Sequence, residues 1–302
     1  MSKSNLLSKI VRTSSHFLSP VLRALGSVVF QTKRAHNGDF PIVFIIGAPR
    51  TGSTFLYQAL TNFADVSYID NLACKFRDAL FFGVYISHLL FGRNQHNNFN
   101  SDHGSTSKFG LHCPSECGEF WYRWFPRDPH FVEADALSAT KLTGLAKELS
   151  QISKFFRRPV VIKNLVCSQR LRVLAQVFPD AKVIVVTRDS EEVLSSILKA
   201  RKARSVPPSM WWSVKPRSYE LYVGLQEQEM VRSQISLISE VISEDVHLFS
   251  PSNVRFVDYT EINKDLVLDI SCWIGASIKS VPSDDVFKGD RRVVKDMPGW
   301  RS

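Results

Sequence analysis

The sequence predicts a three-layer α/β domain in which a central, mostly parallel sheet is flanked by helices. Short apolar runs without alternation are typical of strands buried on both faces, and a helical segment follows each run. The chain has 302 residues, of which 44% are hydrophobic, so it can bury a substantial core. Strands and helices that alternate along a chain favour a parallel sheet, because crossover helices join its strands.

The predicted elements repeat one order along the chain: a strand, a turn and a helix. The first predicted strand ends in a glycine, Gly47, and the third is followed directly by Arg188. The predicted strands are residues 41–46, 160–163, 182–187 and 254–258. The predicted helices that follow them are residues 54–60, 168–178, 191–203 and 266–274. We therefore expect one domain over residues 39–302, preceded by a separate N-terminal segment over residues 1–38.

Two stretches of the predicted domain do not follow this alternation. Residues 70–130 are rich in His, Asn, Phe and Trp, and residues 204–218 contain two adjacent prolines and two adjacent tryptophans. Long irregular insertions in a compact domain are often functional loops or lids. We expect both insertions to lie beside the site and to set its substrate specificity.

The N-terminal segment carries most of the chain's positive charge. Residues 1–38 contain six Lys or Arg and no Asp or Glu, which is +6 of the formal charge of +9. Apolar residues recur there at roughly helical spacing, with an interruption at Pro20, so the pattern predicts an amphipathic basic segment. Reversible attachment to an anionic membrane is one interpretation, and a helix packed on the domain or an organellar targeting sequence are the others. Arg23 interrupts any transmembrane span.

The remaining 264 residues are only mildly basic, which argues against a nucleic-acid partner. Proteins that bind nucleic acid usually carry their positive stripe on the folded domain.

The five cysteines are odd in number and scattered, so they do not indicate a disulfide framework. Cys113 and Cys117 lack a second pair for a metal site. We expect free thiols, a reducing compartment, a cytoplasmic location and no metal.

The turn after the first strand, Gly47–Thr54, predicts an anion site. Backbone N–H groups and the start of the next helix form a cradle for phosphate. Two glycines allow the tight path, and four side chains can donate to phosphate oxygens: Arg50, Thr51, Ser53 and Thr54. The spacing is that of a P-loop with Ser53 in place of the lysine, which argues against an ordinary ATP or GTP hydrolase.

A second phosphate site is predicted at the end of the strand at residues 182–187. Arg188 follows that strand, and Ser196 lies eight residues later, two turns into the next helix. Strand ends and helix starts at one edge of a parallel sheet form its ligand crevice. Arg188 and Ser196 are therefore expected to hold a second phosphate near the first.

These two motifs, in this order, resemble those of the sulfotransferases that use 3′-phosphoadenosine-5′-phosphosulfate (PAPS). The 5′-phosphosulfate loop of that family has the form G-x-P-[KR]-[ST]-G-[ST]-[ST], which Gly47, Pro49, Arg50 and the following residues match. The resemblance covers residues 40–290 and favours the bacterial and Golgi-like carbohydrate branch. It implies nucleoside contacts by Phe55 and Tyr259, for which core packing is the alternative, and a 3′-phosphate contact by Lys288.

The resemblance also implies in-line sulfuryl transfer without a metal. It makes Arg50 the residue that stabilises the departing bridging oxygen, and Lys163 a residue facing the donor. The catalytic histidine of small-molecule members is replaced by Leu165, so the base must come from elsewhere. We expect Glu116 to be the base, with His112 and Glu119 as alternatives. The competing interpretation is that the two glutamates only form structural ion pairs with arginine residues.

The acceptor is not specified by these motifs. Aromatic-rich insertions favour a glycan or glycolipid hydroxyl, and a small molecule or an amine is an alternative. Two other functions compete with sulfuryl transfer. A P-loop-type nucleotide or small-molecule kinase would need ATP, Mg²⁺ and a lysine near position 53. A non-catalytic, membrane-associated binding module would not need two phosphate motifs.

Overall fold

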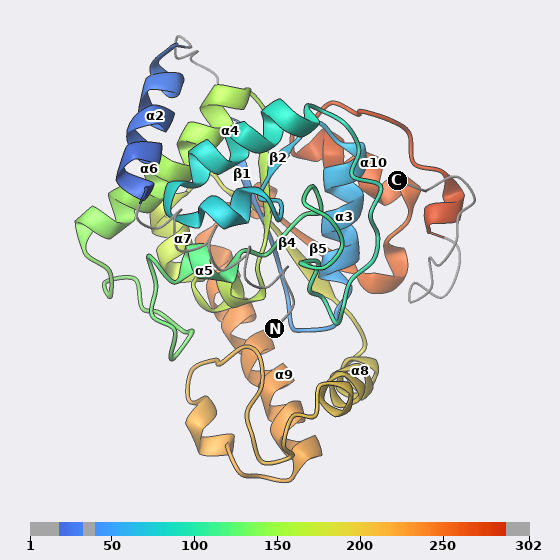
Figure 1. The fold of residues 1–302 in the computed structure, drawn as a ribbon. Helices are drawn as coiled ribbons and strands as arrows, with labels where there is room; N and C mark the ends of the chain where they lie inside the picture. The colour runs from blue at the N-terminus through green and yellow to red at the C-terminus, as the bar shows by residue number, and fades with distance from the viewer. Residues whose placement is uncertain (1–17, 33–39, 288–302) are drawn as a thin grey trace, which may run out of the picture.

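The computed structural model describes residues 18–32 and 40–287, and it confirms the predicted fold class (Figure 1). In the described residues a five-stranded sheet has the order β2-β3-β1-β4-β5, and every neighbouring pair is parallel. The strands are β1 (Ile42–Ile46), β2 (Ser67–Tyr68), β3 (Val160–Lys163), β4 (Lys182–Thr187) and β5 (Val254–Asp258). All four predicted strands are present, and only the two-residue β2 was missed.

The helices cover both faces of this sheet. The α-helices are α2 (Ser19–Thr32), α3 (Ser53–Phe63), α4 (Leu80–Phe91), α5 (Gly118–Trp121), α6 (Ala139–Phe156), α7 (Leu171–Val177), α8 (Ser190–Ala203), α9 (Glu227–Asp245) and α10 (Lys264–Trp273). The 3-10 helices are η1 (Ala73–Ala79), η2 (Leu165–Gln169), η3 (Tyr219–Tyr222), η4 (Val246–Leu248), η5 (Pro251–Asn253), η6 (Tyr259–Glu261) and η7 (Asp284–Val286).

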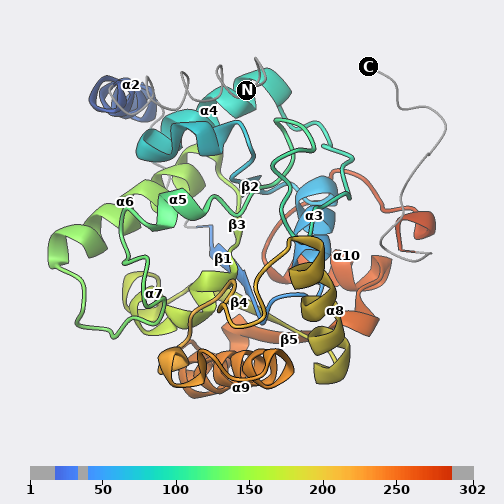
Figure 2. The ribbon, with the colours of Figure 1, turned by 60° about the horizontal axis from the view of Figure 1, so that its bottom comes forward.

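The unbroken apolar sequence of β1 is explained by the two cores that it joins. Phe44 and Ile46 belong to a core with residues of α6 and α7, whereas Val43 and Ile45 belong to a second core with residues of α3 and α10. Figure 2 shows these two helix pairs on opposite sides of the strands. Successive residues of a strand point to opposite faces, so both sets must be apolar.

The stretch 70–130 is more regular than the sequence predicted. It contains η1, α4 and α5, and the next segment forms the long helix α6, which the sequence analysis did not identify. Helix α4 is apolar around most of its circumference, so it lacks the amphipathic period that predicts a surface helix. The stretch 204–218 does lack regular secondary structure, as expected.

The N-terminal segment is helical where the structure describes it. Pro20 stands in the first turn of α2, where a missing N–H costs no hydrogen bond, so it does not interrupt this helix. The helix packs on the domain through Phe30, whose ring lies 5.9 Å from that of Phe81 in α4. No described helix is long and apolar enough to cross a membrane.

The expectation that all cysteines are free is wrong, because Cys74 and Cys117 form a disulfide across a sequence separation of 43. The chain between them folds back along residues 70–72, where the Leu72 N–H donates to the Leu111 carbonyl at 2.9 Å and the Asn71 N–H to the Cys113 carbonyl at 3.0 Å. These contacts are between distant residues, so spacing alone did not reveal the pair. The cysteines therefore no longer support a reducing compartment.

Candidate active site

The predicted anion loop lies at the carboxyl end of β1, and its backbone is strained. Arg50 has φ 70° and Gly52 has φ 92°, both in the left-handed region. A Cβ on Gly52 would stand 2.2 Å from Cδ2 of Tyr259, so only glycine fits between the loop and this ring. Gly52 is also the N-cap of α3 and supplies no capping side chain, which leaves the N–H groups of the first turn to other partners.

The structure brings the second predicted phosphate site against this loop. The Arg50 Nε donates to Ser196 Oγ on α8 at 3.1 Å, and the Arg188 guanidinium lies 4.2 Å from the centroid of the Tyr259 ring. The strand ends of β1, β4 and β5 place these residues at one edge of the sheet. Arg188 also pairs with Glu192 at 2.7 Å, one turn along α8.

Two further predicted residues meet at the end of β3. The Lys163 ammonium, only 2% exposed, donates to the Glu116 carboxylate, which is 32% exposed. Asn164 fixes the same segment, because its Nδ2 donates to the Glu116 backbone carbonyl at 3.1 Å. A buried ammonium needs such a partner, so the pair is held in one arrangement at the wall of the site.

One cavity of about 1090 Å³ connects these groups. Its volume is at the upper end for small-molecule sites, and it suits a nucleotide together with a second substrate. Among its lining residues are the predicted ones Pro49, Arg50, Gly52, Ser53, Thr54, Phe55, Glu116, Glu119, Lys163, Arg188, Ser196 and Tyr259. Glu119 pairs with Arg127 at 2.7 Å.

Two predicted donor residues within the described part of the chain do not line the cavity. Gly47 supports the loop from beneath, since a Cβ there would stand 2.5 Å from the Val186 carbonyl oxygen. Thr51 is buried and its hydroxyl donates to the Ala48 carbonyl at 3.1 Å. Lys288 lies outside the described residues. Phe55 lines the cavity but also packs on Phe99, with the two ring centroids 6.0 Å apart, so its ring belongs partly to the core.

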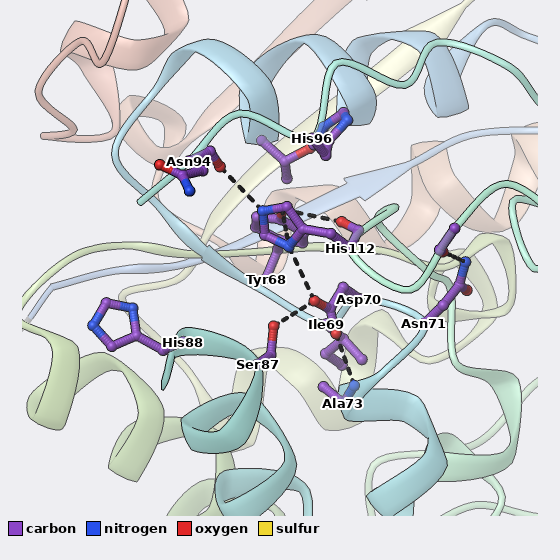
Figure 3. Close-up of polar contacts among 12 residues, drawn as sticks. Tyr68, Ile69, Asp70, Asn71, Ala73, Ser87, His88, Asn94, His96 and His112 are labelled. Atoms are coloured by element: carbon purple, nitrogen blue, oxygen red, sulfur yellow. Dashed lines mark hydrogen bonds and ion pairs between the residues drawn. The ribbon is translucent and has the colours of Figure 1, made fainter. Parts of the chain in front are cut away.

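His112 lies away from the other catalytic candidates, against the buried carboxylate of Asp70 (Figure 3). Its Nδ1 stands 3.2 Å from Asp70 Oδ2, and its Nε2 stands 3.0 Å from the Asn94 carbonyl. Its ring stacks on Phe91 at 4.4 Å, and it lines a separate small cavity. Residues 111–115 run beside 69–72, and this pairing directs His112 away from Glu116.

Asp70 is the centre of this separate cluster, and Figure 3 shows Ser87 and His112 on its carboxylate. The Ala73 N–H donates to Asp70 Oδ1 at 2.7 Å, and the Ser87 hydroxyl donates to Oδ2. Because Ser87 and His112 both contact the carboxylate rather than each other, the cluster is not a Ser-His-Asp catalytic arrangement. It joins α4 to the chain that leads to Glu116.

One loop that closes one side of the cavity lies in the stretch 70–130, which we expected beside the site, but its residues were not singled out from the sequence. Residues 101 and 103–107 line it, including His103, and the Arg204 Nη2 ties the loop down by donating to the Asp102 carbonyl at 2.9 Å. Burial and the cations Arg50 and Arg204 lower the pKa of His103, so its ring is neutral near pH 7. No motif marks this loop.

Lys199 also lines the cavity and was not predicted from the sequence. It lies three residues after Ser196 on the same face of one helix, and this spacing could have identified it as a cavity residue.

Comparisons with known proteins point to one family. The sulfotransferase family model matches residues 41–267. The omega-hydroxy-beta-dihydromenaquinone-9 sulfotransferases Stf3 of Mycobacterium bovis and Mycobacterium tuberculosis are each 28% identical over an alignment of 214 residues, and the match covers 62% of this chain and 53% of theirs. The chain thus spans about half the length of these curated relatives.

Two solved structures share the fold at low sequence identity. Sulfotransferase STF1 from Mycobacterium tuberculosis H37Rv has a TM-score of 0.54 at 17% identity and covers 94% of this chain and 78% of its own. Sulfotransferase STF9 from Mycobacterium avium has a TM-score of 0.50 at 13% identity, over 82% of this chain and 65% of its own. Because the family model matches most of the chain, including both phosphate motifs, this protein belongs to the sulfotransferase family.

Proposed function

We propose that this chain transfers a sulfuryl group from PAPS to a hydroxyl of its acceptor, with an amine as the alternative nucleophile. One observation carries the proposal: a single cavity joins the anion loop, the Arg188 and Ser196 site, and the Lys163–Glu116 pair. Two separated phosphate sites suit a donor with both a 5′ and a 3′ phosphate. No observation favours a kinase, since Ser53 stands where a P-loop needs lysine.

The residues around the loop form what we call the donor side: residues 49–55, Arg188, Ser196 and Tyr259. The loop and the start of α3 would hold the 5′-phosphosulfate through backbone N–H groups. Arg188 and Ser196 would hold the 3′-phosphate, and Tyr259 and Phe55 would contact the nucleoside. Gly47 and Thr51 would support the loop from within. The contact by Lys288 stays a prediction.

The transfer itself needs a base, a stabilised leaving group and little else. The acceptor oxygen would form the new S–O bond while the bond from sulfur to the bridging oxygen breaks, and that electron pair stays on the 5′-phosphate. Arg50 would neutralise the charge on this oxygen, and Lys163 would stabilise the sulfuryl group in transit. Glu116 would accept the acceptor's proton. Glu119 is the second candidate base, while His112 lies outside the cavity and is not part of this proposal.

The acceptor side is the part of the cavity wall formed by residues 101 and 103–107, residues 115–119, Arg204, Trp212 and Ser213. Both insertions noted in the sequence contribute to it, which supports their proposed role in specificity. The curated relatives are named for a hydroxylated menaquinone. We therefore favour a hydroxyl-bearing lipid, such as a glycolipid, over a free glycan or small molecule. Such an acceptor suits a peripheral location on a membrane, whereas the Cys74–Cys117 disulfide does not support the cytoplasmic location that we expected from the sequence.

Calorimetry with adenosine 3′,5′-bisphosphate and with ATP plus Mg²⁺ tests the donor. We expect the bisphosphate to bind at least tenfold more tightly, because each added charge-assisted phosphate contact contributes about 1.5–3 kcal/mol. The full chain should then release the bisphosphate from PAPS when a hydroxylated lipid is supplied. Binding of ATP with Mg²⁺ in preference to the bisphosphate would contradict the proposal.

A further inference from the structure

Helix α2 presents an apolar stripe to the solvent. Leu18 directly precedes the helix, and Val21, Leu25 and Val28 lie on it, at steps of three and four residues that place all four side chains on one face. Their exposed fractions are 51%, 56%, 48% and 59% in that order. Scattered exposed apolar residues need no explanation, but a continuous stripe along a helix marks an interaction surface.

The opposite face of α2 is packed on the domain, so the stripe is held in place. A Cβ on Gly26 would stand 3.1 Å from Cδ1 of Phe81, which shows how closely the helix backbone approaches α4. Phe30 packs edge-on against the same ring, and Arg23 Nε donates to the Asp78 carbonyl at 2.5 Å. The helix therefore has one apolar face for the core and a second one that no described residue covers.

Helix α4 lies beside α2 and exposes apolar side chains of its own. Both views show the two helices next to each other at one flank of the molecule, far from α8 and α9 (Figures 1 and 2). Near the end of α4, Leu89 and Leu90 are 61% and 64% exposed. The side chain of Arg93 just beyond them is 66% exposed, and its guanidinium stands 3.5 Å from the Asp65 carboxylate. The twelve residues of α4 include no Asp, Glu, Lys or Arg. Exposed leucines next to an exposed arginine are typical of a surface that meets lipid.

The charge of the chain indicates which partner covers this surface. Residues 1–38, which include α2, carry six Lys or Arg and no Asp or Glu. A second copy of the chain would bring an equal positive charge against this segment, and the repulsion opposes pairing. An anionic bilayer instead attracts basic residues, at about 1 kcal/mol for each one near the surface. Apolar side chains and cations together match the interface of such a bilayer.

We propose that the outer stripe of α2 and the end of α4 form a docking surface for an anionic lipid bilayer, with α2 lying in the plane of the headgroups. Helix η1 continues directly into α4, and its Cys74 lines the cavity. We expect the acceptor to be a lipid of the same bilayer; this consequence rests on the proposed function, whereas the docking itself does not.

Vesicle co-sedimentation of the full chain, without donor or acceptor, tests the docking. We compare vesicles of phosphatidylcholine alone with vesicles that also contain phosphatidylglycerol. The double substitution Val21→Ser and Leu25→Ser should weaken binding to the anionic vesicles by about tenfold or more, because it removes two buried apolar side chains from the interface. The matched control is Leu221→Ser, since Leu221 in η3 is 78% exposed on another part of the molecule and should not affect binding.

The outcomes separate the proposal from its rivals. Equal binding of the double variant and the wild type would overturn it, and so would equal binding to both kinds of vesicle. Light scattering in solution tests pairing of two copies: a dimer that the double variant converts to a monomer, with vesicle binding unchanged, would also overturn it. Binding of the bisphosphate by the double variant should equal that of the wild type, so a failure of docking leaves the donor proposal intact.

Discussion

The donor side and the acceptor side of the cavity are built in different ways. Donor-side residues lie within a few positions of a strand end or on the first turns of the next helix, as Arg50 and Arg188 do. The acceptor side comes from loops whose positions depend on contacts between distant residues, such as the bond from Arg204 to the Asp102 carbonyl. A site at strand ends is therefore specified by short sequence patterns, whereas a site on loops is specified by long-range packing.

The largest expected effect is at Glu116, where the two sides meet. Glu116→Gln keeps the size of the side chain but removes the base, so kcat should fall by about 10²–10⁴-fold while bisphosphate binding is unchanged. Steady-state kinetics and calorimetry measure the two quantities. The control Glu119→Gln lies in the same cavity and should lose far less activity. A greater loss of kcat in the Glu119 variant would contradict the prediction and would make Glu119 the base.

Arg188→Ala tests whether the donor side has separate phosphate sites. We expect binding of adenosine 3′,5′-bisphosphate to weaken by about 10–100-fold, because a charge-assisted contact to the 3′-phosphate is lost. Binding of adenosine 5′-phosphate should change little. Calorimetry with both ligands makes the comparison, and equal losses for the two would count against the 3′ role of Arg188.

Gly52→Ala tests the fit between the anion loop and the Tyr259 ring. The new Cβ would meet the ring at 2.2 Å, so the loop must shift and bisphosphate affinity should fall by about tenfold. Gly224→Ala is a matched control, because Gly224 has nearly the same φ, 91° against 92°, with no heavy atom within 4 Å of its Cβ position. Both variants should lose about 1–2 kcal/mol of unfolding free energy because of their left-handed backbone. Gly52→Ala should lose more because of the clash, and only Gly52→Ala should lose affinity.

The paired substitution Cys74→Ser and Cys117→Ser tests the acceptor side. Without the disulfide, η1 and the segment next to Glu116 are no longer joined, so the KM for the acceptor should rise several-fold and the free energy of unfolding should fall by about 2–4 kcal/mol. Bisphosphate affinity should not change. Cys272→Ser, at an exposed free thiol, is the control. A large loss of donor affinity would show that the two sides are not independent.

Near neutral pH the smallest expected effect is the dependence of stability on pH. Burial lowers the pKa of His96 to about 3 and that of His130 to about 4, and both lie in the stretch 70–130. Since the unfolded chain binds these protons near pH 6.5 and the folded chain does not, stability is full above pH 6.5 and falls as the pH drops towards 4. Urea unfolding at a series of pH values measures this slope. His96→Gln should reduce it, whereas His247→Gln, at an exposed position, should leave it unchanged.

Much of the fold could be predicted from the sequence because each buried strand is a continuous run of apolar residues. The run at residues 42–46 packs against helices on both faces, so every position is apolar, and the same holds for residues 160–162. Helices α4, α6 and α9 were missed for different reasons: α4 has no polar face, while α6 and α9 follow no strand that would have drawn attention to them.

The sequence by itself determined the donor side. The loop from Gly47 to Thr54 and the pair Arg188 and Ser196 follow strand ends, and the parallel sheet brings all such ends to one edge. Only the tertiary structure decided which acidic and basic groups line the cavity. Glu116 meets Lys163, whereas His112, four residues earlier, turns to Asp70. That choice depends on how a long segment folds back over η1, because packing between distant residues, not local propensity, sets the direction of a loop side chain.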